Sequence, residues 1–177
     1  MCECERVIMT PGKPLNLDAL WSAVKEYFGA DGARIEHARR VHTYALSILH
    51  GEPRADEMIV EAAAMLHDIG IPEAERKHGS AAGEWQELEG PPVAREILTG
   101  LGADEAFIVE VCRLIASHHS PGEVETIEFD CLWDADWLVN LPEVHGEVAD
   151  EKRLALVERI FRTATGKRIA RKLFAQG

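Results

Sequence analysis

Histidine and aspartate residues interrupt the apolar pattern of the sequence at four places. They are His37, the pair His67-Asp68, the pair His118-His119, and Asp134 with Asp136. Burying such groups without partners is costly, so their position on inward-facing stripes and at helix ends calls for an explanation. A divalent cation would satisfy them together, because imidazole nitrogen and carboxylate oxygen are ligands for Mn, Fe, Co, Ni, Zn or Mg. The helix predicted to end just after Asp68 would also direct its negative dipole end at such a cation.

The elements that must position these residues are helices, because apolar residues recur at helical spacing along almost the whole chain. The predicted helices cover about 16–28, 34–50, 56–70, 91–102, 104–119 and 129–141, with a final long helix from about 150 to 173. Residues 71–90 read as irregular, apart from a short helix near 73–79. The prediction is an all-α protein, in which an N-terminal tail at 1–15 precedes one bundle of six to eight helices at 16–177.

Four segments resemble, in the same order, the motifs of HD-domain phosphohydrolases. His37-Ala-Arg-Arg-Val41 is similar to the family's H-x-x-R-V pattern, and Ala64-Met-Leu-His67-Asp68-Ile-Gly70 resembles the apolar helix ending in His-Asp. Leu114-Ile-Ala-Ser-His118-His119 resembles the later histidine element, and Asp134-Ala-Asp136-Trp-Leu138 resembles the closing aspartate element. The resemblance runs from about residue 34 to 140 and extends through most of the predicted helices.

This resemblance implies an all-α fold and the hydrolysis of a phosphoester. It also implies a first metal site made of His37, His67, Asp68 and Asp136. In the family's closing element the ligand aspartate precedes a variable residue and an apolar one, which selects Asp136 over Asp134. Asp68 would be catalytic as well, because it would orient a water molecule whose pKa the bound cation lowers.

A second group of residues completes the expected site. His118 would be catalytic, either by binding the substrate phosphate, by binding a second metal or by donating a proton to the leaving oxygen. The candidates for a second metal or for phosphate binding are His118, His119, His78, Glu89 and Lys77. Family members with two metals often carry a further histidine shortly before the glycine that opens the next helix. Gln86 occupies the matching position here, so the number of cations is left open.

The expected substrate is a small phosphorylated metabolite, most simply a nucleotide or dinucleotide. Nucleotidase-like members place Glu three residues after the His-Asp pair, where this chain has Ile71, and no Gly-Tyr-Pro element follows His119. These differences disfavour a simple nucleoside monophosphatase and the cyclic-dinucleotide phosphodiesterase branch. The pattern does not distinguish a phosphomonoesterase from a phosphodiesterase.

The same fold allows two other interpretations. One is a non-catalytic domain that binds a metal or nucleotide as a sensor or interaction module. The loss of a site aspartate would favour it, but both Asp68 and Asp136 are present. The other is an oxygenase, which needs two irons and so depends on the second site.

The amino-acid composition of the chain argues against some classes of binding partner. Lys and Arg number 19 against 31 Asp and Glu, which gives a net charge of −12 and argues against a nucleic-acid partner. No apolar run reaches the roughly 18–20 residues of a membrane span, and the acidic N-terminus does not resemble a signal peptide. We therefore expect a cytoplasmic protein without a membrane partner, and the sequence leaves its oligomeric state open.

Overall fold

The computed structural model describes residues 15–120, 122, 124–144 and 150–174, and within them the regular structure is helical. The helices are α1 Leu17–Phe28, α2 Gly32–Leu49, α3 Glu57–Leu66, α4 Ile71–His78, α5 Gly83–Gly100, α6 Glu105–Ile115, α7 Ile127–Val144, α8 Asp150–Ile160 and α9 Ala164–Phe174. The all-α prediction is therefore confirmed.

Several helices begin where a short polar side chain can accept a backbone N–H. Asn16 Oδ1 accepts from Ala19 N at 3.0 Å, and Asp104 Oδ1 accepts from Phe107 N at 3.0 Å. Asp56 starts α3 in the same way. Each of these caps satisfies a donor that the first turn of a helix leaves free, so the start points are encoded locally.

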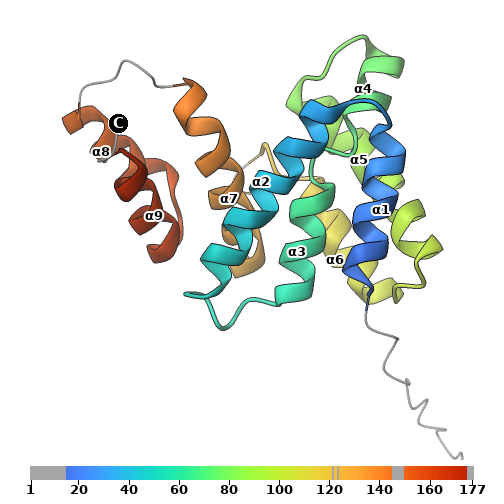
Figure 1. The fold of residues 1–177 in the computed structure, drawn as a ribbon, viewed down its shortest axis with the longest axis horizontal. Helices are drawn as coiled ribbons and strands as arrows, with labels where there is room; N and C mark the ends of the chain where they lie inside the picture. Colours follow the sequence, from blue (N-terminus) through green and yellow to red (C-terminus); the bar gives the residue numbers. More distant parts are fainter. Residues whose placement is uncertain (1–14, 121, 123, 145–149, 175–177) are drawn as a thin grey trace, which may run out of the picture.

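The helices pack around one apolar core. In Figure 1, α7 lies between the α2–α3 pair and the C-terminal α8–α9 pair, while α1, α5 and α6 gather on the other side of α3. Helix α3 is the most deeply enclosed, since every residue from Val60 to Leu66 is buried. The largest fully buried side chains include Leu20, Ile48, Met65, Leu98, Ile115 and Phe129.

Several predicted element boundaries differ from the structure. The helices predicted at 56–70 and 104–119 end earlier, at Leu66 and Ile115, so Asp68 and His118-His119 follow these helices. Residues 71–90 are mostly helical rather than irregular: they form α4 and the first turns of α5, so Pro91 and Pro92 lie inside α5 instead of opening it. Buried residues of this stretch include Gln86, Glu89 and Gly90. A helix face built from polar and glycine residues has no apolar periodicity, so periodicity did not predict a helix here.

The predicted final helix is divided into α8 and α9. The break falls at 161–163, where Asp134 of α7 accepts hydrogen bonds from Arg162 N and Thr163 N, both at 2.8 Å. These bonds join the break to α7, while α9 itself is capped by Thr163, whose Oγ1 accepts from Gly166 N at 2.8 Å. The contact with Asp134 is long-range, so local propensity does not reveal it.

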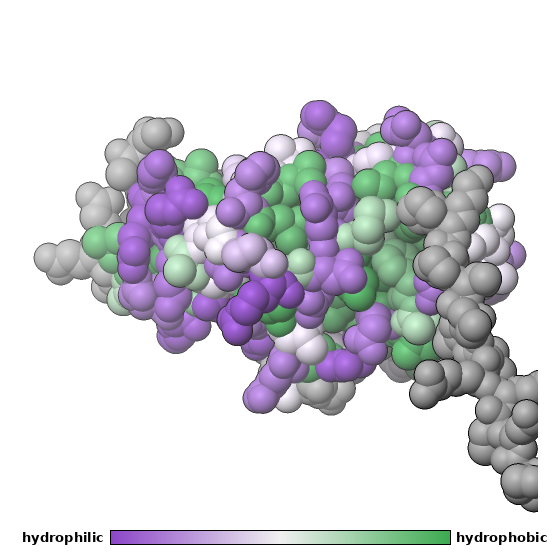
Figure 2. Space-filling view, turned by 90° about the horizontal axis from the view of Figure 1, so that it is seen from below, coloured by the Kyte–Doolittle hydropathy of each residue, from purple (hydrophilic) through white to green (hydrophobic). Residues whose placement is uncertain are grey.

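The surface is mixed in character. Figure 2 shows hydrophilic residues interspersed with apolar areas over the face seen from below. Among the described residues the exposed large apolar side chains are Leu88, Val109 and Leu154. None of the described helices has the length and apolar character that crossing a membrane requires.

Candidate metal centre

Three separate parts of the fold bring His37, His67, Asp68 and Asp136 together. Helices α2 and α3 run antiparallel, so His37 near the start of α2 lies beside the end of α3, where His67 and Asp68 follow (Figure 1). Asp136 comes from α7, which packs against α2.

The distances within this group are short. His37 Nε2 lies 3.2 Å from His67 Nε2 and 3.1 Å from Asp136 Oδ1. Asp68 Oδ2 lies 3.4 Å from the Nε2 atoms of both His37 and His67. Two imidazole nitrogens and two carboxylate oxygens thus face a common point, and the set that the resemblance implied is brought together.

The histidine rings are oriented by backbone carbonyls. His67 donates from Nδ1 to the carbonyl of Ala64 at 3.0 Å, and His118 donates from Nδ1 to the carbonyl of Ile115 at 2.7 Å. A ring that donates from Nδ1 presents the lone pair of Nε2 when it is neutral. Histidines that bind metals commonly have this arrangement, because the backbone bond fixes both tautomer and orientation.

Asp68 connects this group to a second one. Its Oδ2 faces His37 and His67, whereas its Oδ1 lies 3.6 Å from His118 Nε2. Asp68, His118 and His119 form a further group whose potential ligand atoms lie within 4.8 Å of one another. One aspartate therefore contributes an oxygen to each of two adjoining groups.

His118 Nε2 is buried and has no hydrogen-bond partner among the described residues. An unpaired buried polar atom costs on the order of 1–3 kcal/mol. Because the neutral ring offers a lone pair there, a cation would satisfy it directly, whereas a phosphate oxygen would require the ring to be protonated first. The donor chemistry thus fits a divalent metal ion.

Electrostatics support the same conclusion. Burial lowers the pKa of His67, but the carboxylates of Asp68 and Asp136 outweigh it and raise that pKa to about 9. Burial acts to raise the pKa of Asp68, while His67 and His118 hold it well below its usual range. The carboxylates are therefore charged, and they favour positive charge between them. A cation would replace the proton on His67, as metal ligands must be deprotonated.

Exposure differs across the group. The His67 side chain is 1% exposed, whereas that of His37 is 23% exposed and those of Asp68 and Asp136 are each 16% exposed. The centre is therefore closed behind His67 and accessible on the side of His37 and the two carboxylates, where a substrate could approach.

Three side chains that motif reasoning did not assign contact the candidate ligands. Asn140, one turn after Asp136 in α7, donates to Asp136 Oδ1 at 2.9 Å. Gln86 Oε1 lies 3.2 Å from His119 Nε2, and Glu87 Oε1 accepts from the backbone N–H of His119 at 2.9 Å. The spacing of four residues in one helix could have suggested Asn140. Gln86 stands where related chains carry a site histidine, but its contact with His119 and that of Glu87 have no local signal.

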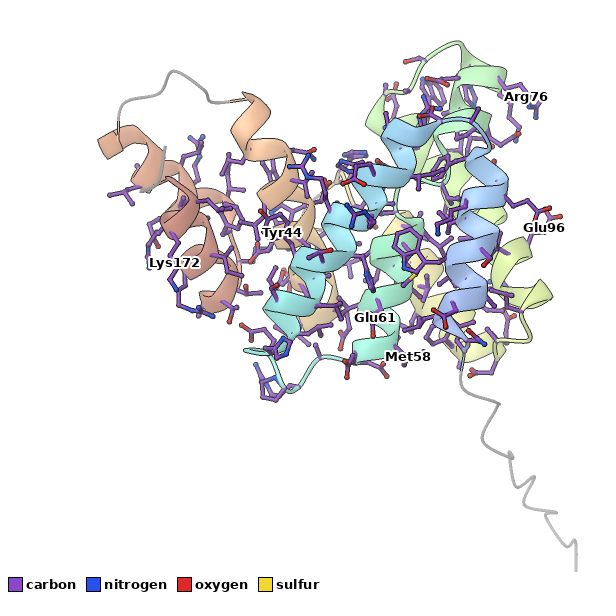
Figure 3. All side chains as sticks on the ribbon, viewed as in Figure 1. Tyr44, Met58, Glu61, Arg76, Glu96 and Lys172 are labelled. Atoms are coloured by element: carbon purple, nitrogen blue, oxygen red, sulfur yellow. The ribbon has the colours of Figure 1, made fainter. Side chains whose placement is uncertain are left out.

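The other candidates form a cluster of their own. Lys77 Nζ donates to Glu89 Oε2 at 2.5 Å, and His78 Nε2 lies 2.9 Å from Glu89 Oε1. His78 also stacks on Trp85, with ring centroids 4.0 Å apart. Arg76, which precedes Lys77, points away from the body of the protein in Figure 3. These contacts join α4 to α5, and a phosphate-binding role for Lys77, His78 and Glu89 stays a prediction.

Asp134 and His42 have partners outside the centre. Asp134 is fully buried and also accepts from the Thr163 hydroxyl at 2.7 Å, so it orients the residue whose Oγ1 caps α9 by accepting from Gly166 N. His42 lies 2.8 Å from Glu61 Oε2 and meets the edge of Trp21. Figure 3 places Glu61 on α3, within the helical body.

Comparisons with known proteins agree with this geometry. The family model described as "HD domain" matches residues 34–160. The chain is similar to a crystal structure described as a predicted HD superfamily hydrolase from an uncultured Thermotogales bacterium, with a TM-score of 0.67 and 27% sequence identity. That alignment covers 90% of this chain and 86% of the other. Among the curated proteins no match was found.

Proposed function

Since this chain belongs to the HD domain family, we propose that it is a metal-dependent phosphohydrolase acting on a small phosphorylated metabolite, such as a nucleotide or dinucleotide. The observation that carries the proposal is the convergence of His37 Nε2, His67 Nε2, Asp68 Oδ2 and Asp136 Oδ1. These four residues would hold the cation. When bound, a divalent cation supplies a water molecule of lowered pKa and a Lewis acid for a phosphoryl oxygen.

The residues of the chain would share the remaining tasks. Asp68 would accept a hydrogen bond from the attacking water, because its Oδ2 faces His37 and its Oδ1 faces His118. His118 offers a proton acceptor at Nε2 beside that carboxylate. His37, the most exposed of the four proposed ligands, lies on the side from which the phosphate would enter.

The net charge of −12 makes local positive charge essential for an anionic substrate. The exposed side of the centre carries two carboxylates, which alone would repel a phosphate. A cation between them reverses the sign of the local field, which explains how an acidic protein could bind a phosphoester.

The first experiment is metal analysis of the purified protein, together with a Mn-supplemented phosphatase screen over nucleotides and dinucleotides. About one equivalent of metal with turnover of one substrate class would support the proposal, and about two would show that the Asp68, His118 and His119 group is also occupied. Protein that binds no added Mn, Fe or Zn and hydrolyses no phosphoester would contradict it and favour the sensor. Intact Asp68 and Asp136 count against that alternative.

A further inference from the structure

The first two turns of α5 hold the segment His119-Ser120 by several contacts. Gln86 Oε1 lies 3.2 Å from His119 Nε2, and Glu87 accepts from the backbone N–H of His119 at 2.9 Å and from Ser120 Oγ at 2.8 Å. Gly83 lies against the imidazole: a Cβ atom placed there would be 2.8 Å from the ring of His119. His119 is therefore positioned by α5 as well as by its own segment.

The Gln86 amide has a defined orientation. Its Nε2 donates to the carbonyl of Ala81 at 2.7 Å, so its oxygen is the atom directed at His119. A carbonyl oxygen only accepts, and His119 must therefore donate from Nε2. Gln86 is 8% exposed, so this acceptor is held within the fold, although His119 itself is exposed.

This bond determines which nitrogen of His119 is available for chemistry. A neutral imidazole carries one proton, and when Nε2 holds it, Nδ1 has the lone pair. His67 and His118 have the opposite arrangement, because both donate from Nδ1 to backbone carbonyls. Of these three rings, two are thus held through Nδ1 and His119 is held through Nε2.

We propose that Gln86 is a positioning residue that holds His119 in the Nε2–H form, so that His119 acts through Nδ1 as an acceptor. The group of Asp68, His118 and His119 then offers two lone pairs and a carboxylate oxygen. It accepts a cation or a proton rather than donating a hydrogen bond to the substrate phosphate. The catalytic consequence rests on the proposed function, but the tautomer does not.

The direct test is long-range ¹H–¹⁵N NMR of the metal-free protein at about pH 8, above the ordinary imidazole pKa of about 6.5. His119 signals are assigned by their loss in His119→Gln. We expect protonated Nε2 and unprotonated Nδ1 for His119. A wild-type His119 protonated at Nδ1 would overturn the proposal.

Variants separate this role from a merely structural one. Gln86→Leu removes the acceptor at similar volume, and the His119 signals should shift toward a mixture of both tautomers. Gln86→Glu keeps an acceptor and should retain the Nε2–H form. The matched control is Glu84→Gln, an exposed residue of the same helical turn, which should change nothing. An unchanged tautomer in Gln86→Leu would refute the role.

Activity gives an independent second readout. For the substrate found in the screen, Gln86→Leu should lower kcat by about tenfold, the size usual for residues that orient ligands, with little effect on KM. Gln86→Glu should recover part of the loss. A wild-type protein without phosphoester hydrolysis would contradict the proposed function, and the NMR result would still decide the role of Gln86.

Discussion

His37 Nε2 and His67 Nε2 lie 3.2 Å apart, although the two residues are 30 positions apart in the chain and belong to different elements. Two lone pairs at this distance repel, so a proton or a cation must lie between the rings. The carboxylates of Asp68 and Asp136 supply the matching negative charge.

His67→Ala should therefore abolish stable metal binding and phosphoester hydrolysis while helical content is retained. The substitution removes the buried nitrogen that faces both carboxylates. Metal content after dialysis and circular dichroism measure the two effects. The matched control is His50→Ala, because His50 makes the same kind of Nδ1 bond to a carbonyl, that of Leu46 at 2.7 Å, at the other end of α2. A His67→Ala protein with wild-type metal content would show that the centre is misplaced.

Asn140→Ala should weaken metal binding about tenfold, as expected for a residue that orients a ligand. Asn140 donates to Asp136 Oδ1, the oxygen nearest His37, and without that bond the carboxylate can rotate. Titration calorimetry with Mn measures the affinity. Equal affinities for wild type and Asn140→Ala would mean that Asp136 needs no such support.

Asp134→Ala should destabilise the protein by about 1–3 kcal/mol, because it leaves the buried donors of Arg162 and Thr163 without their acceptor. Urea unfolding measures the change. Asp130→Ala, one turn earlier in α7, removes a partly exposed ion pair to Arg162 and should cost less than about 1 kcal/mol. Comparable losses in the two variants would contradict the role of Asp134 as the buried acceptor for Arg162 and Thr163.

Gly70→Ala should cost about 1–3 kcal/mol and reduce metal binding, since there is no space for the added methyl group. A Cβ atom on Gly70 would lie 2.6 Å from Gln86 O and from Gly90 N, and backbone atoms cannot move aside as a flexible side chain can. Gly70 follows Asp68 by two residues, so relief of the clash would displace the ligand. Gly100→Ala is the control, because nothing lies within 4 Å of its added Cβ; thermal unfolding should show no loss there.

The sequence predicts those parts of the centre that short motifs encode. His37 stands on a helix, and His67 and Asp68 follow the end of another, where apolar periodicity locates them; their order along the chain resembles a known family. The motif alone selects Asp136 over Asp134, and the structure gives the physical difference: Asp136 faces His37, whereas Asp134 binds the backbone that precedes α9.

The contacts that support the centre could not be predicted in this way. Gln86 meets His119 across 33 positions of sequence, and the first turns of α5 have no apolar stripe that would reveal a helix there. The contact between His42 and the buried Glu61 joins two different helices, so it could not be predicted either. Such contacts depend on how helices pack, which neither propensity nor periodicity specifies.

The contact between His37 and Asp136 spans 99 residues, which has a consequence for the newly made chain. While the protein is being synthesised, His37, His67 and Asp68 leave the ribosome well before α7, and without Asp136 the group has only part of its donors. A complete centre can therefore form only once α7 has been made and has packed on α2, so the cation would enter a nearly finished fold. Binding of the cation would then connect the two ends of a long stretch of chain. Late metal uptake would therefore stabilise the assembled protein rather than start its folding.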